Sequence, residues 1–210
     1  MIPRIVHQTW KTSNVEYWIF KRSQHSVETF FPKWQYRLWT DADLDSLMHR
    51  EFPAYYEKWL ALDRQIKRVD TARYCLLYKF EGLYADLDFI FTLGLEDILD
   101  EQFDLFFYKS TQAIVKNWDF LGNALMISKP QQAFWLGALE YIFSLPAHTE
   151  VLQHTGPRAL GAYYASLEEK PNVRIFGPEI FDNEHCADGV GARRYGYHVR
   201  AATWQQKSSP

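Results

Sequence analysis

The middle of this 210-residue chain holds a helical stretch, a glycine and an apolar strand that ends in two aspartates. Apolar residues recur at spacings of three and four over residues 63–80, which predicts an amphipathic helix. We expect Gly82 to end this helix, because glycine adopts left-handed dihedral angles at little cost. A strand is predicted over residues 83–86, and it brings Asp86 and then Asp88 to its end. A helix that leads directly into a buried strand favours a layered α/β fold.

The remaining periodicity repeats this alternation of strands and helices. Further strands are predicted at residues 4–8, 35–39, 103–108, 121–127, 173–176 and 197–199, and further helices at 16–31, from Thr40 and Asp41 onwards, and at 53–62, 131–143 and 157–167. This order predicts one α/β domain over residues 1–204, with a mostly parallel central sheet flanked by helices. Residues 205–210 are polar and are predicted to form a flexible tail. In such sheets, ligands bind beyond the carboxyl ends of the strands.

Charge and hydropathy exclude several classes of protein. The formal net charge is −3, whereas a nucleic-acid-binding domain is normally basic, so we expect no nucleic-acid partner. No apolar run reaches the roughly 18 residues of a transmembrane segment. The first ten residues lack the regions of a signal peptide, and two cysteines make no disulfide framework. A cytoplasmic location is therefore the expectation.

Asp86 and Asp88 are the first candidates for chemistry. Residues two apart on a strand point to the same side, and two neighbouring carboxylates repel unless a cation lies between them. Oxygen ligands of this kind suit Mg²⁺ or Mn²⁺. The alternative is a solvated turn in which both carboxylates cap a helix. The short pattern alone leaves both interpretations open.

Asp70 and Arg73 lie three residues apart on one face of the predicted helix. An exposed pair of this kind is an ordinary ion pair of small energetic value. The neighbouring Val69 and Tyr74 indicate a buried environment instead. Buried charged pairs more often belong to a ligand site or a polar network.

Several segments together resemble glycosyltransferase family 32. Asp70-x-x-Arg73-Tyr74 and Leu83-Tyr84-Ala85-Asp86-Leu87-Asp88 resemble its sugar-binding Asp-x-Asp region. Residues 2–11, Asn123 with the strand after it, Thr155-Gly156-Pro157, and His198 with Trp204 resemble its other motifs. The family includes yeast outer-chain-initiating α-1,6-mannosyltransferases and inositol-phosphoceramide mannosyltransferases. The motif spacing is also similar to that of clostridial toxin glucosyltransferase domains.

One departure from the family concerns the turn after the long helix. The family usually has Gly-Gly where this chain has Glu81-Gly82. We therefore expect Gly82 alone to make the tight turn and Glu81 to keep ordinary dihedral angles.

The resemblance implies a GT-A (nucleotide-diphospho-sugar transferase) fold with a bound Mn²⁺ or Mg²⁺. It implies that Asp88 binds the metal directly and that Asp86 helps through the ribose, the sugar or a metal-bound water. His198 is the candidate for a further protein ligand, since imidazole suits Mn²⁺. An ordinary packed histidine remains the alternative for His198.

The same resemblance assigns residues to the donor. Asp70 and Arg73 would hold hydroxyls of the donor sugar, and Asn123 would lie beneath the anomeric carbon. Tyr84 would contact the nucleotide. Trp10 would stack on the base, with simple core packing as its alternative, and Trp204 would close over the diphosphate.

The implied activity is transfer of a sugar from a UDP- or GDP-sugar to a hydroxyl of a glycan, glycolipid or glycoprotein. Transfer would retain the anomeric configuration, and peripheral contact with a membrane is compatible with it. The first alternative is a non-catalytic protein that binds carbohydrate or nucleotide sugar. A phosphotransferase with Asp86 as nucleophile is a weaker alternative, because Ile90 stands where such enzymes have threonine or valine.

Overall fold

The computed structural model describes residues 2–181 and 194–201. Its strands are β1 (Ile5–Thr9), β2 (Gln35–Trp39), β3 (Gly82–Ala85), β4 (Phe89–Phe91), β5 (Leu105–Tyr108), β6 (Leu125–Ser128), β7 (Val173–Phe176) and β8 (Gly196–His198). Its helices are α1 (Trp18–Phe30), α2 (Asp41–Glu51), α3 (Pro53–Leu60), α4 (Gln65–Phe80), α5 (Thr111–Val115), α6 (Ala133–Ser144), α7 (Val151–His154), α8 (Pro157–Ser166) and α9 (Pro178–Phe181). Trp204, Cys186 and the predicted tail at 205–210 lie outside the described residues.

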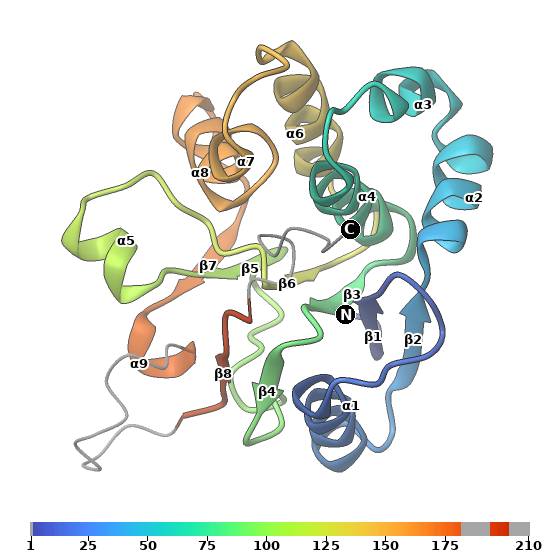
Figure 1. The fold of residues 1–210 in the computed structure, drawn as a ribbon. Coiled ribbons are helices and arrows are strands. Elements are labelled where there is room, and N and C mark those ends of the chain that lie inside the picture. The colour runs from blue at the N-terminus through green and yellow to red at the C-terminus, as the bar shows by residue number, and fades with distance from the viewer. Residues whose placement is uncertain (1, 182–193, 202–210) are drawn as a thin grey trace.

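The central sheet has the strand order β2-β1-β3-β6-β5-β7, with helices on both of its faces (Figure 1). Strand β1 pairs in parallel with β2 and β3, and β5 pairs in parallel with β7. Strand β6 runs antiparallel to both of its neighbours. The predicted α/β class with a mostly parallel sheet is confirmed, and β6 makes the sheet mixed.

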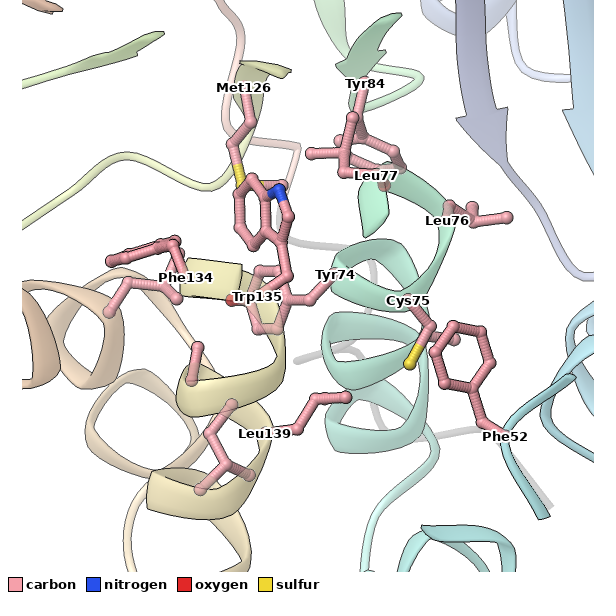
Figure 2. Close-up of a cluster of buried hydrophobic side chains, with 14 of the residues drawn as sticks. Phe52, Tyr74, Cys75, Leu76, Leu77, Tyr84, Met126, Phe134, Trp135 and Leu139 are labelled. Carbon is pink, nitrogen blue, oxygen red and sulfur yellow. The ribbon is translucent and has the colours of Figure 1, made fainter. Parts of the chain in front are cut away.

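Successive side chains of the strands point to opposite faces of the sheet and contribute to two hydrophobic cores, one on each face. Tyr84 and Met126 point to the face covered by α2, α3, α4, α6 and α8. Figure 2 shows this core, in which the rings of Tyr74 and Trp135 stack at a centroid distance of 5.7 Å. Leu83 points to the opposite face, where α1, α9 and β4 pack. The core therefore fixes α4 against β3; these two elements and the turn after β3 carry five of the nine candidate residues.

The turn between α4 and β3 differs from the sequence prediction at Glu81. Gly82 does adopt a positive φ of 81°, and a Cβ there would lie 2.4 Å from Cγ2 of Ile5. Glu81 also has a positive φ of 56°, with ψ at −162°, so the expectation of ordinary dihedral angles was wrong. This region of dihedral space is close to glycine-only. The chain must reverse within two residues to place β3 beside β1, and both residues have a positive φ, which is strained only for Glu81.

His7 secures this strained turn. It is fully buried on β1, its Nε2 hydrogen bonds to the carbonyl oxygen of Glu81, and the indole N–H of Trp39 donates to its Nδ1. The side chain therefore ties β1 to the end of β2 and to the start of β3. Burial lowers the pKa of His7 to about 4. His7 is a structural brace.

A second, two-stranded sheet brings the C-terminal part of the chain back to the middle. Strand β8 pairs antiparallel with β4, and His198 lies opposite Phe89. Figure 1 shows β4 and β8 side by side below the main sheet. Among the described helices, none is long and apolar enough to cross a membrane.

Candidate metal and donor site

The Asp-x-Asp segment forms a turn at the carboxyl end of β3. The backbone N–H of Phe89 donates to the carbonyl oxygen of Asp86 at 2.9 Å, which closes the turn. The expectation that Asp86 and Asp88 point to the same side because they lie two apart on a strand was therefore wrong in its local geometry, since β3 ends at Ala85. The two carboxylates still converge, because the tight turn keeps both at the same edge of the sheet.

His198 faces these carboxylates from β8. Its Nε2 lies 3.1 Å from Oδ1 of Asp88 and 3.9 Å from Oδ2 of Asp86. One ligand atom from each of the three residues lies within 4.8 Å of the other two. Two carboxylate oxygens and one imidazole nitrogen form a donor set that suits Mn²⁺, and the three residues therefore fit a divalent ion.

Asp88 is held firmly in its ionised form. Its Oδ2 accepts a hydrogen bond from the backbone N–H of Ala201 at 2.7 Å, and its carbonyl oxygen accepts one from the N–H of Val199 at 2.9 Å. Burial alone would raise the pKa of Asp88, but the hydrogen bonds from His198 and Ala201 outweigh it and lower the pKa. The chain after β8 thus closes on the second aspartate of the motif.

Arg73 joins the motif to helix α4. Its Nη1 lies 2.9 Å from Oδ1 of Asp86, and its Nη2 lies 3.1 Å from Oδ1 of Asp70. Nη1 also donates to the carbonyl oxygen of Asn123. The Arg73 and Asp70 side chains are both 4% exposed, so the predicted pair on one helical face belongs to a buried network.

Asp70 anchors the far end of this network. The hydroxyl of Thr155 donates to its Oδ2 at 2.9 Å, and the side-chain amide of Asn123 donates to its Oδ1 at 3.2 Å. Burial raises the pKa of Asp70 to about 6, against the opposing effect of Arg73. The hydroxyl of Tyr74 donates to the carbonyl oxygen of Thr155. The network therefore connects α4, the loop before β6 and the segment before α8.

Tyr84 reaches the motif from inside the sheet. Its side chain is fully buried, and its hydroxyl donates to Oδ1 of Asp86 at 2.8 Å. The same hydroxyl lies 2.9 Å from that of Thr9 on β1. In this conformation Tyr84 presents no surface to a donor, and its contact with Asp86 orients that carboxylate.

Trp10 follows β1 at the same edge. It is partly exposed, it packs edge-on against Phe20 at a centroid distance of 4.6 Å, and it joins the small cluster that contains Leu87. Trp10 is thus available for stacking while it contributes to packing. Trp204, the other tryptophan predicted to contact the sugar donor, is not among the described residues.

Sequence reasoning gave no role to Thr9, Tyr74 or Thr155, although all three are bonded to the site. Tyr74 and Thr155 lie in segments that resemble family motifs, and this was a usable signal. Thr9 and Tyr84 are separated by 75 residues, and no local pattern predicts such a contact.

The geometry also selects one Asp-x-Asp pattern among several. Asp41, Asp43 and Asp45 form the same spacing on α2. There Asp43 completes a capping box with Thr40. Only the pair at the end of β3 faces His198 and contacts the buried arginine within the described part of the chain.

The structure brings together the paired carboxylates, His198 and the buried Asp70–Arg73 pair. This is the arrangement expected from the resemblance to sugar transferases of the Asp-x-Asp class. Residues 19–104 match the family described as "Glycosyltransferase sugar-binding region containing DXD motif". The sugar-binding region of this chain, residues 19–104, therefore belongs to that glycosyltransferase family, and the predicted resemblance is confirmed.

Curated relatives agree with this assignment. The chain is 33% identical over 215 residues to inositol phosphoceramide mannosyltransferase 1 of Schizosaccharomyces pombe, covering 97% of this chain and 62% of that protein. It is 27% identical over 201 residues to inositol phosphoceramide mannosyltransferase 3 of the same yeast, covering 89% and 53%. It is 28% identical over 193 residues to mannosyl phosphorylinositol ceramide synthase CSH1 of Saccharomyces cerevisiae, covering 85% and 48%. The chain thus spans about half the length of these proteins.

A solved structure shares the fold. The PaToxG glycosyltransferase superposes with a TM-score of 0.58 at 16% identity, over 77% of this chain and 68% of that one. The likeness confirms the expected GT-A-like architecture.

Proposed function

We propose that this chain is the catalytic domain of a metal-dependent glycosyltransferase. It moves a hexose from a nucleoside-diphosphate sugar to a hydroxyl group of a glycolipid. The names of the relatives favour mannose as the hexose and an inositol-bearing phospholipid as the acceptor. Transfer retains the anomeric configuration.

One observation carries the proposal. Arg73 contacts Asp86 of the motif and Asp70 of the buried network at the same time. The cation site and the polar network are therefore parts of one structure. A site for a divalent ion beside a set of buried hydrogen-bonding groups suits a ligand that carries both a diphosphate and a sugar.

The chemistry of each side chain indicates its role in the proposed site. Asp88, Asp86 and His198 would hold Mn²⁺ or Mg²⁺, and the ion would offset negative charge on the leaving diphosphate. Asp70 and Asn123 present a carboxylate and an amide suited to sugar hydroxyls. Because Tyr84 and Arg73 both bond Oδ1 of Asp86, its Oδ2 is directed towards His198 and the cation site.

The proposed reaction needs no separate base. The acceptor oxygen forms a bond to the anomeric carbon on the face from which the diphosphate departs, as the bond between that carbon and the phosphate oxygen breaks. The proton of the acceptor hydroxyl passes to the departing diphosphate oxygen. The protein orients the groups and excludes water, which limits hydrolysis of the donor.

Donor turnover tests this proposal. The protein is incubated with a panel of UDP- and GDP-sugars, with Mn²⁺ or with a chelator, and released nucleoside diphosphate is quantified. We expect release from one donor, dependent on metal and lost in Asp88→Asn. The matched control is Glu57→Gln, which neutralises an exposed carboxylate on α3 and should leave release unchanged.

Metal-independent release, or release that survives in Asp88→Asn, would overturn the assignment of the cation site. If no donor is turned over even with inositol phospholipid present, while nucleotide sugar still binds, the chain is a binding protein of the transferase fold.

A further inference from the structure

Helix α5 carries an apolar tip that no described part of the chain covers. Val115 is 78% exposed and Ile114 is 52% exposed, whereas Ala113 on the inner side is buried. Figure 1 shows α5 standing out from the body of the molecule. Asn117 has a positive φ of 48° and its N–H bonds back to the carbonyl oxygen of Ile114, so the helix ends sharply with its apolar residues at the tip.

Two cationic side chains lie next to this tip, at the ring of Trp118. Trp118 lies between them: Nζ of Lys116 is 4.8 Å from its ring centroid, and the guanidinium carbon of Arg158 is 4.7 Å away. Lys109 precedes the helix, and Asp119 is the one acidic residue between positions 109 and 121. We call Ile114, Val115, Lys116, Trp118 and Arg158 the α5 surface. Its charge is complementary to an anionic partner.

The α5 surface lies beside the candidate site. Helix α5 follows the carboxyl end of β5, and the chain runs from Trp118 to Asn123 in five residues. The N–H of Gly122 bonds the carbonyl oxygen of Tyr108, and the N–H of Leu121 bonds that of Pro157, so this loop is fixed to β5 and α8. Whatever binds the α5 surface is held next to the edge of the sheet where transfer is proposed.

We propose that the α5 surface docks the protein on an anionic lipid bilayer. Ile114 and Val115 enter the interfacial region, Trp118 lies at headgroup level, and the long stems of Lys116 and Arg158 reach lipid phosphates. An aliphatic tip beside a tryptophan that lies between two cations suits a lipid–water interface better than a protein, whose partner surface would have to match it in shape. The link to an acceptor in the same bilayer rests on the proposed function; the docking itself does not.

Vesicle binding tests the docking. The full chain is mixed with vesicles of phosphatidylcholine, with and without phosphatidylserine, and bound protein is measured by sedimentation. We expect binding only with phosphatidylserine. The double substitution Ile114→Ser and Val115→Ser should weaken it about tenfold or more. Lys116→Ala should weaken it about fivefold, whereas Lys33→Ala, an equal charge change in the loop between α1 and β2, should not.

Thermal denaturation confirms that the variants fold, which is expected because the substituted side chains are exposed. Equal binding by all variants, or none to phosphatidylserine vesicles, would overturn the docking. A dimer in solution that becomes monomeric in the double variant would also overturn it, since the partner of the α5 surface would then be a second copy of the chain. Release of nucleoside diphosphate is measured in parallel without vesicles. If neither the unsubstituted protein nor any variant releases it, the result counts against the proposed function and not against the docking.

Discussion

Arg73 on helix α4 and Asp86 at the end of β3 are joined by a contact of 2.9 Å between Nη1 and Oδ1. The same guanidinium lies 3.1 Å from Asp70. One buried cation therefore neutralises carboxylates from two elements, and the packing of α4 on β3 sets their separation. The geometry of the Asp-x-Asp turn is in this way coupled to the hydrophobic core.

Arg73→Met should destabilise the fold strongly. It leaves Asp70 buried without its cation, and breaking a buried charge pair costs about 3 kcal/mol or more. Urea denaturation measures the change in the free energy of unfolding. Arg50→Met, at an exposed position of α2, should change it by less than about 0.5 kcal/mol. Similar values for the two variants would show that the Arg73 network contributes little.

Tyr84→Phe should impair donor turnover more than donor binding. The substitution removes the hydroxyl that orients Asp86 and leaves Thr9 with one partner fewer. We expect a loss of about 1–2 kcal/mol in stability and a fall in kcat at nearly constant KM. Thr9→Val should have a smaller effect in the same direction. Unchanged kcat in Tyr84→Phe would contradict an orienting role.

Glu81→Gly should stabilise the protein. Glu81 has a φ of 56° and a ψ of −162°, a region that glycine occupies without strain, and its Oε2 is buried without a hydrogen-bond partner. We expect a gain of about 1 kcal/mol in the free energy of unfolding. Gly82→Ala should do the opposite, since the new Cβ would lie 2.7 Å from the carbonyl oxygen of Ile5. A loss of stability in Glu81→Gly would contradict the strain.

Neutral, buried His7 should make a contribution to stability that mild acid removes. Its pKa falls from 6.5 to about 4 on burial, so between these values the unfolded chain binds more protons than the folded one. The contribution is fully present above pH 6.5 and is lost as the pH falls towards 4, by about 3 kcal/mol in total. His7→Gln, which keeps a donor and an acceptor, should lack this dependence. The free energy of unfolding is measured against pH for both proteins. Equal slopes between pH 4 and pH 6.5 would contradict the contribution of His7.

Much of the fold could be predicted from local patterns. The strands β2 and β7 agree with the sequence prediction residue for residue, and Thr40 caps α2 as its hydroxyl suggested. The direction of β6 could not be predicted, because its apolar run is equally compatible with either orientation. The strain at Glu81 was also missed: it is imposed by the tight approach of β3 to β1, which is a tertiary constraint.

The candidate site also combines residues that local patterns predicted with contacts that only the tertiary structure sets. The charged residues Asp70, Arg73, Asp86 and Asp88 were noticed by their spacing, and the resemblance to the family assigned them to a donor and metal site. Thr155 meets Asp70 across 85 residues, and the backbone N–H of Ala201 meets Asp88 across 113. Hydroxyl and backbone groups have no periodicity of their own, so only the folded chain reveals these contacts. The roles of Trp10 and Asn123 towards a donor stay predictions.

The most direct measurement is a calorimetric titration of the protein with UDP and with GDP, in Mn²⁺ and in chelator. The account predicts saturable binding of one nucleoside diphosphate that requires Mn²⁺ and disappears in Asp88→Asn, while Glu57→Gln binds as the unsubstituted protein does. Equal binding in chelator and in Mn²⁺, or binding that Asp88→Asn leaves intact, would contradict the claim that Asp86, Asp88 and His198 hold the ion on which the donor depends.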